Sequence, residues 1–169
     1  MPAVALAIAF SAPPSLANQA GPAADPLTFI EGLACQGGKF SLRLPSTLPG
    51  LLALAPRHGE KKLETQRWEG YTATRMQIFF DGLAVDLVTY SNDPNRYSLE
   101  RATIRSAAWA SLASFAVGED IESVRATFGD VAKHDAQLRS VYSSENESVR
   151  FETTKAGKVS AIIYECYTG

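Results

Sequence analysis

The two cysteines, Cys35 and Cys166, are the residues whose chemistry and spacing stand out most in this chain of 169 residues. In an exported protein, an even number of widely separated cysteines is typical of a disulfide. That bond would close most of the chain into one loop and stabilise the fold by about 4–5 kcal/mol through chain entropy. The alternatives are two separate buried thiols or, less favoured, a lipid anchor at Cys35, because Asp25 and Glu31 interrupt the apolar run that such an anchor requires.

The histidines and paired carboxylates do not form a catalytic pattern. His58 follows a predicted helix end and His134 lies in a polar connector, so both are expected in exposed loops. Nucleophilic catalysis needs a nucleophile, a base and an orienting group, and no serine lies in a G-x-S-x-G setting. Glu119 and Asp120 are expected at a helix N-terminus, where negative charge is favourable without a catalytic role. The sequence therefore predicts a protein that is not an enzyme.

Ligands for a metal ion or a cofactor are not clustered in the sequence. The two cysteines lack neighbouring ligands at the spacing of a zinc site. The segment SNDPN contains Asp93 but lacks the spaced acidic residues of a calcium loop, so it is expected as an ordinary loop. There is no glycine-rich phosphate loop. We therefore expect no metal and no cofactor.

Composition and the first twenty residues favour an exported, folded protein. Hydrophobic residues make up 46% of the chain, which predicts a packed core, and the net charge of -2 argues against a nucleic-acid partner. Residues 1–20 combine the apolar run VALAIAF with SAPPSLANQA, as in a secretory signal cleaved after Ala17 or Ala20, although a basic n-region is missing. The alternative is a flexible tail. No run reaches the roughly 20 residues of a transmembrane helix, so we expect a periplasmic or secreted protein.

Hydrophobic periodicity predicts an α+β fold rich in antiparallel strands. A short helix is expected after Ser46 or Thr47 and before Pro56, and another over 121–128, capped by Asp120. The pair Asp81-Gly82 predicts a tight hairpin turn, and the segment 109–120 is expected to be helical. Strands are expected at 40–44, 63–71, 74–80, 83–90, 96–107, 136–143, 147–154 and 158–167.

The order of these elements suggests an internal duplication. Each half runs helix, glycine and three strands, and the halves align through Gly59 with Gly129, Tyr71 with Tyr142, Phe79 or Phe80 with Phe151, and Tyr90 with Tyr164. The expected architecture is two helix-plus-antiparallel-sheet repeats packed as one compact unit. Its parts are a leader at 1–20, a first repeat at 21–108 and a second repeat at 109–169.

The second repeat also resembles a known family. The segments VGEDIESVRATFGD and VRFETTKAGKVSAIIYE are similar to the SmpA/OmlA (BamE-like) outer-membrane lipoproteins and to the tandem-repeat beta-lactamase inhibitor proteins. The first repeat departs from that pattern at Pro49 and Pro56. The resemblance implies an exported fold whose curved antiparallel sheet docks on another protein, with no catalytic residues to transfer. The positions that fit the pattern are Gly118, Asp120, Val124, Phe128 and Gly129.

Residue types that anchor protein interfaces, mainly Trp, Tyr and Arg, occur in or beside the predicted loops and strand ends. For any one aromatic residue the alternative is a place in the core. Glu145 and Glu147 are expected in a hairpin tip that could plug a basic catalytic cleft. The candidate contact residues are Trp68, Tyr71, Tyr90, Asp93, Arg96, Tyr97, Tyr142, Glu145 and Glu147.

These features together predict a protein-binding module, with another protein as its partner and an oligomeric state left open. The favoured role is an inhibitor or immunity protein that neutralises an enzyme such as an antibacterial effector or a wall hydrolase. The alternatives are an envelope-assembly accessory protein and a small hydrolase of unrecognised type.

Overall fold

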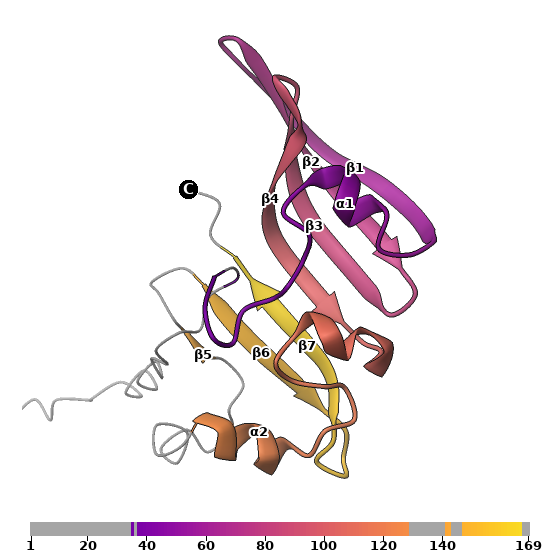
Figure 1. Ribbon diagram of the computed structural model, residues 1–169, viewed down its shortest axis with the longest axis vertical. Helices are drawn as coiled ribbons and strands as arrows, with labels where there is room; N and C mark the ends of the chain where they lie inside the picture. The colour runs from indigo at the N-terminus through magenta and orange to yellow at the C-terminus, as the bar shows by residue number, and fades with distance from the viewer. Residues whose placement is uncertain (1–34, 36, 129–140, 143–146, 167–169) are drawn as a thin grey trace, which may run out of the picture.

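The computed structural model describes residues 35, 37–128, 141–142 and 147–166, which form one antiparallel sheet with short helices (Figure 1). The predicted leader, Gly129, His134 and Glu145 lie outside the described residues. The helices are α1 (Leu48–Leu52), the 3₁₀ helix η1 (Ala107–Leu112) and α2 (Ile121–Phe128). The strands are β1 (Arg57–Trp68), β2 (Tyr71–Phe80), β3 (Leu83–Tyr90), β4 (Asp93–Ile104), β5 (Val141–Tyr142), β6 (Ser148–Thr153) and β7 (Val159–Glu165). The α+β class expected from periodicity is confirmed.

Tight turns join the first four strands into a meander. The expected turn at Asp81 and Gly82 is confirmed: Gly82 has a φ of 69°, and a Cβ there would collide with the side chain of Ser106. The next turn is shorter than expected, because only Ser91 and Asn92 lie between β3 and β4 and Asp93 already belongs to the strand. The loop predicted over the whole SNDPN segment is therefore wrong.

Pairing between β4 and β7 joins the two halves of the chain into a single sheet, in the order β1-β2-β3-β4-β7-β6-β5. Ala102 lies opposite Tyr164, and Ile104 opposite Ile162. All four side chains are buried, with at most 1% of their surface exposed. Every neighbouring pair in the sheet is antiparallel. The two halves therefore share one sheet and one core.

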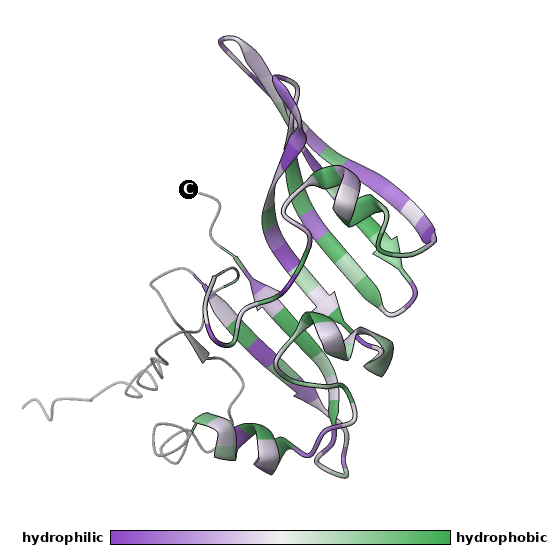
Figure 2. Cartoon of the chain, in the orientation of Figure 1, coloured by the Kyte–Doolittle hydropathy of each residue, from purple (hydrophilic) through white to green (hydrophobic). Residues whose placement is uncertain are grey.

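The core lies on one side of this sheet, which we call the inner face. Alternate residues of β3, Leu83, Val85 and Leu87, point into it. Helix α1 and the coil before it cross the same side (Figure 1) and contribute buried Leu51 and Phe40. Hydrophobic residues recur along β2, β3 and β7, whereas β1 is mostly hydrophilic (Figure 2) and exposed along its whole length. The opposite face is therefore largely uncovered over β1–β3, but not over β7, where Ile163 on that face is also buried.

A cluster of phenylalanine rings fills the core beneath the second half of the sheet. Phe115 lies at the centre, 5.1 Å from the ring of Phe128 in α2 and 5.1 Å from the ring of Phe151 in β6. Phe40, from the coil before α1, lies 5.3 Å from Phe128. Segments far apart in the sequence therefore meet in one cluster, which buries the apolar side of α2.

The capping residues of both helices follow the sequence. Thr47 accepts a hydrogen bond from the Gly50 amide at the start of α1, and Asp120 accepts one from the Glu122 amide at the start of α2, at 2.9 Å. This backbone hydrogen bond, together with Lys158 at 3.3 Å, lowers the pKa of the Asp120 carboxyl. The Asp120 cap is therefore formed when its carboxyl is ionised and is lost as pH falls through that lowered pKa.

Three expected elements differ from the structure. Residues 41–45 form no strand, although Phe40 and Leu42 are buried as the alternation required. The helix expected from Trp109 onward is only the 3₁₀ helix η1, which also contains the expected repeat boundary at 108 and 109. Gly59 lies inside β1 and not at a helix end, because α1 stops at Leu52 and a long strand begins at Arg57. Local periodicity reports burial and does not reveal whether a pairing partner is within reach.

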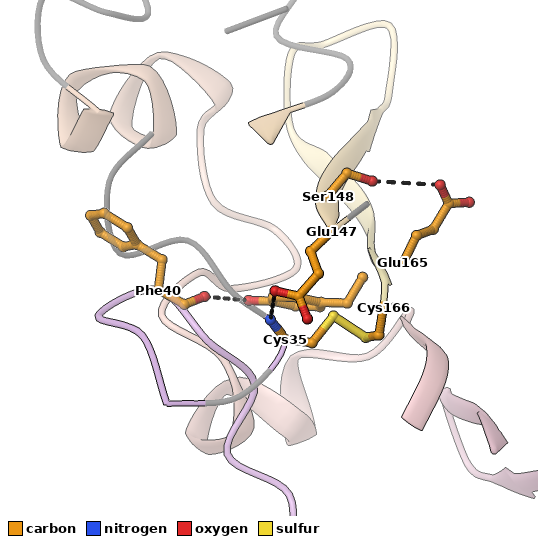
Figure 3. Close-up of a disulfide and its surroundings, with 7 residues drawn as sticks. Cys35, Phe40, Glu147, Ser148, Glu165 and Cys166 are labelled. Atoms are coloured by element: carbon orange, nitrogen blue, oxygen red, sulfur yellow. Dashed lines mark hydrogen bonds between the residues drawn. A yellow bond between two sulfur atoms is a disulfide. The ribbon is translucent and has the colours of Figure 1, made fainter. Parts of the chain in front are cut away.

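A disulfide joins Cys35 to Cys166, with Cα atoms 5.6 Å apart (Figure 3). The predicted bond is confirmed. It fixes the coil before α1 to the end of β7, and the Tyr164 side chain reinforces this because its hydroxyl donates to the Phe40 carbonyl at 3.1 Å. Within the coil, the Leu42 amide donates to the Cys35 carbonyl. The core below β7 is therefore closed by a segment with no strand pairing of its own.

Replacing both cysteines, as Cys35→Ser/Cys166→Ser, should lower the free energy of unfolding by about 5 kcal/mol, because the bond closes a loop with a sequence separation of 131 residues. Urea denaturation followed by far-ultraviolet circular dichroism measures this change. Wild-type protein in a reducing buffer should unfold at the same urea concentration as the variant. A variant as stable as the oxidised wild type would contradict the prediction.

Candidate functional site

The face of the sheet opposite the core, which we call the outer face, has a hollow of about 390 Å³. Alternation along β2 turns Ile78 and Phe80 inward and brings Tyr71, Ala73 and Arg75 to the outer face. The hollow therefore belongs to the uncovered side of β1–β4. Its lining residues are Glu64, Gln66, Trp68, Tyr71, Ala73, Arg75, Val88, Tyr90 and Glu100.

The strand register explains why a hollow forms there. Ala73 lies opposite Gln66 of β1 and Tyr90 of β3, and it forms the floor of the hollow because its side chain is small. Two residues nearer the β1–β2 turn, Trp68 lies opposite Tyr71. Two residues farther from that turn, Arg75 lies between Glu64 and Val88. Large side chains therefore surround a single alanine, with aromatic rings at one end and charged groups at the other.

The aromatic end consists of three neighbouring rings, which we call the aromatic cluster: Trp68, Tyr71 and Tyr90. The rings of Trp68 and Tyr71 are nearly parallel, at 14°, with centroids 6.5 Å apart, and Tyr71 lies 6.1 Å from Tyr90. The Tyr90 hydroxyl shares a hydrogen bond of 2.9 Å with Ser98 on β4. Trp68 is 57% exposed. The rings are held by one another and still face solvent.

Arg96 adds a cation to this cluster. Its guanidinium carbon lies 4.7 Å from the centre of the Tyr90 ring, a cation–π contact. Asp93, which pairs with Tyr90 across the β3–β4 turn, is exposed, and its carboxylate accepts a hydrogen bond from the Asn95 amide. Arg96 and Asp93 therefore flank the cluster at the start of β4.

The charged end of the hollow is an ion-pair network. The Arg75 guanidinium donates to the Glu100 carboxylate at 2.9 Å and lies 3.8 Å from the Glu64 carboxylate. The hydrogen bond to Glu100 raises the pKa of Arg75. The Glu100 side chain is 17% exposed, whereas that of Glu64 is 49% exposed and also accepts from the Gln66 amide. Glu64 is therefore the carboxylate that is more accessible from solvent.

The structure brings together four of the predicted contact residues, Trp68, Tyr71, Tyr90 and Arg96, with Asp93 beside them. It places Tyr97 elsewhere, because β4 turns that side chain into the core, where it is 8% exposed and its hydroxyl donates to the Pro45 carbonyl at 2.5 Å. Burial raises the pKa of the Tyr97 phenol. Tyr97 therefore contacts the coil before α1 and is not part of the candidate surface.

The second predicted contact region does not join the cluster. Glu147 directly precedes β6, and its carboxylate accepts a hydrogen bond from the Cys35 amide at 3.4 Å, beside the disulfide (Figure 3). Glu147 lies in the connection between the paired strands β5 and β6, as the predicted hairpin requires, but its half-buried carboxylate contacts the Cys35 segment and not the outer-face cluster. Tyr142 of β5 pairs with Ser148 of β6. The Tyr142 side chain and the whole of Glu145 lie outside the described residues.

The sequence reasoning missed the lining residues that are not aromatic, chiefly Glu64, Ala73 and Glu100. A signal was present, because Glu69-Gly70 separates two alternating runs and Gly70 takes a φ of 84° in the turn between β1 and β2. That turn fixes the register from Trp68 opposite Tyr71 to Glu64 opposite Arg75. Glu100 could not be found in this way, since a bulge in β4 sets its position.

The remaining sequence predictions concern catalysis, metal binding and membrane insertion. His58 is exposed, but it lies on strand β1 and not in a loop. Within the described ranges there is no group of three or more His, Cys, Asp or Glu side chains placed to hold a metal ion. Among the helices that the structure describes, none is long and apolar enough to cross a membrane.

Trp68→Ala should lower the free energy of unfolding by less than about 1 kcal/mol, because the exposed ring contributes little burial. Trp109 is the matched control: its ring packs 5.8 Å from Phe80, and its indole N–H donates to the Asp81 carbonyl. Trp109→Ala should cost about 2–3 kcal/mol. Urea denaturation of the two variants measures the difference, and equal losses would show that Trp68 is a structural residue.

No protein-family model matches the chain, and neither a curated protein nor a solved structure does. The resemblance to the SmpA/OmlA and beta-lactamase inhibitor families therefore remains a prediction from the sequence motif.

Proposed function

We propose that this chain is an exported protein-binding module that inhibits or neutralises an enzyme, and that it contacts this partner through the outer face around the hollow. The observation that carries the proposal is the aromatic cluster with Arg96 beside it. Tryptophan, tyrosine and arginine are the residue types that most often dominate binding energy at protein interfaces. Here they converge on a face that the described helices leave uncovered.

The mutual packing of the rings supports a binding role. Trp68 is one of two exposed large hydrophobic residues among those described, and both of them, Leu63 and Trp68, lie on β1. Stacking on Tyr71 restricts the Trp68 ring before any partner arrives, which reduces the entropy lost on binding. Rigid aromatic anchors with adaptable polar neighbours are also the composition of engineered and natural binding surfaces.

The disulfide supports export. Disulfides persist in oxidising compartments and are rare in the reducing cytosol, and the bond between Cys35 and Cys166 ties down a segment that otherwise has no strand partner. With the signal-like residues 1–20, this favours the periplasm or the exterior of the cell as the site of action. An enzyme that acts on the cell wall, or an antibacterial effector, would be met there.

We also infer that the two halves arose by duplication, as the family resemblance implies. Each half is a short helix followed by an antiparallel meander, and the last strand of each meander, β4 or β7, pairs with the other. The halves differ in strand number and length, since β1 has twelve residues and β5 has two. The larger first half is the one that carries the hollow.

Trp68→Ala/Tyr90→Ala should abolish capture of the partner, because both changes remove walls of the hollow and leave the core intact. The full chain serves as bait for a cell-envelope extract, with Lys155→Ala, an exposed change in the turn between β6 and β7, as the control. The proposal expects one protein that is retained by the wild type and by Lys155→Ala and lost with the double variant.

The retained protein is then purified and assayed for catalysis with increasing amounts of the chain. Loss of activity at a one-to-one ratio is the expected result. A retained protein with no catalytic activity that belongs to outer-membrane assembly machinery would overturn the inhibitor role in favour of an accessory role. Turnover of wall fragments by the chain itself, abolished by His58→Ala, would overturn the binding role altogether.

A further inference from the structure

The hollow on the outer face combines two features that favour a positive charge. One end is the aromatic cluster, whose ring faces carry the negative side of the π quadrupole. The other end holds the carboxylates of Glu64 and Glu100, with Arg75 as the only lining cation among the described residues. Two carboxylates and one guanidinium leave the lining with a formal charge of minus one.

The distribution of this charge matters as much as its sum. Arg75 hydrogen-bonds to Glu100 at 2.9 Å and only approaches Glu64, at 3.8 Å. Glu100 is therefore the carboxylate that Arg75 neutralises, and Glu64, about half exposed, carries the remaining charge at the rim. A carboxylate at this position offers an incoming ammonium or guanidinium a charge-assisted hydrogen bond.

The chain already contains one example of this recognition. Arg96 lies with its guanidinium carbon 4.7 Å from the centre of the Tyr90 ring. Arg96 itself is not among the residues that line the hollow. Cation–π contacts of this kind are strongest with Trp and Tyr, which supply all three rings here.

The size and the floor of the hollow suit one long side chain. At about 390 Å³ it is near the lower end of the range for ligand pockets, roughly 300–1,000 Å³. Ala73 and Val88 give an apolar surface between the aromatic and the charged ends, against which the methylenes of a lysine or an arginine can pack. The guanidinium or ammonium then reaches Glu64.

From these observations we propose that the hollow receives a single basic side chain, an arginine or a lysine, presented by the partner protein. The inference rests on the proposed function and names the chemistry of the partner: a protein whose contact surface is positively charged around one protruding basic residue. Such complementarity also steers association and excludes acidic partners.

The test uses the full oxidised chain and small probes, so it does not require the partner. The probe is the peptide acetyl-Gly-Arg-Gly-amide, and its control replaces arginine with citrulline, which has nearly the same shape and no charge. Binding is followed by NMR through the Trp68 indole and the Ala73 amide, with the Trp109 indole as an internal reference. The arginine peptide should shift the first two signals and bind at least tenfold more tightly than the citrulline peptide.

Substitutions then locate the binding site. Ala73→Leu should abolish binding of the arginine peptide, because the larger side chain fills the floor of the hollow. The control is Ala84→Leu. Ala84 lies on β3 opposite Phe79, about 20 Å along the sheet from Ala73, so this change should leave binding of the arginine peptide unchanged. Glu64→Gln keeps the shape of the rim and removes its charge, so it should weaken the arginine peptide about tenfold and the citrulline peptide much less.

Equal binding of the two peptides, or arginine-peptide shifts that survive Ala73→Leu, would overturn the inference. These outcomes are separate from those of the capture experiment. A partner that is lost with Trp68→Ala/Tyr90→Ala while the two peptides bind equally leaves the proposed function standing and refutes the basic side chain. Selective binding of arginine without any cluster-dependent partner confirms a cation site and refutes the proposed function.

Discussion

The antiparallel pairing between β4 and β7 is the interaction on which the rest of this structure depends. It lies between two meanders and is the only strand pairing that joins them in the described residues. Both strands place buried side chains on the inner face, with Tyr164 and Ala102 at the seam. The coil before α1 then closes the core through the Tyr164 hydroxyl and the disulfide to Cys166. Loss of this pairing would separate the Phe115 cluster from the inner face of β2–β4.

The described helices lie over the inner face, so side chains alone organise the outer face of the first half of the sheet. Over β4, β6 and β7 the outer face carries ion pairs, such as Arg101 with Glu165 and Arg105 with Glu152, at 2.8 Å each. Exposed pairs of this kind contribute little to stability. Over β1–β3 the face carries the aromatic cluster and the hollow. The ion pairs over β4, β6 and β7 keep that part of the face polar. The exposed rings over β1–β3 have no comparable structural use, and the binding proposal therefore rests on them.

The residue types at the candidate site could be chosen from the sequence, but their grouping could not. Tryptophan, tyrosine and arginine near strand ends were sound candidates because such residues anchor interfaces. Tyr97 and Tyr90 have the same side-chain chemistry, yet the bulge-containing register of β3 and β4 sends one to the core and leaves the other on the outer face. Glu147 lies between β5 and β6 as predicted, but local sequence does not reveal that its carboxylate accepts a hydrogen bond from the Cys35 amide. A one-residue change of register reverses the face of every side chain, so these outcomes depend on strand pairing.

The sequence by itself determined the α+β class, the caps at Thr47 and Asp120, the turn at Gly82 and the partnership of the two cysteines. Each of these follows from local stereochemistry or from a residue count, and needs no knowledge of distant neighbours. Tertiary structure alone decided that both halves share one sheet, that residues 41–45 are coil and not a strand, and that Ala73 is the floor of a hollow. Those features arise from contacts between segments far apart in the chain, which periodicity within one segment does not encode.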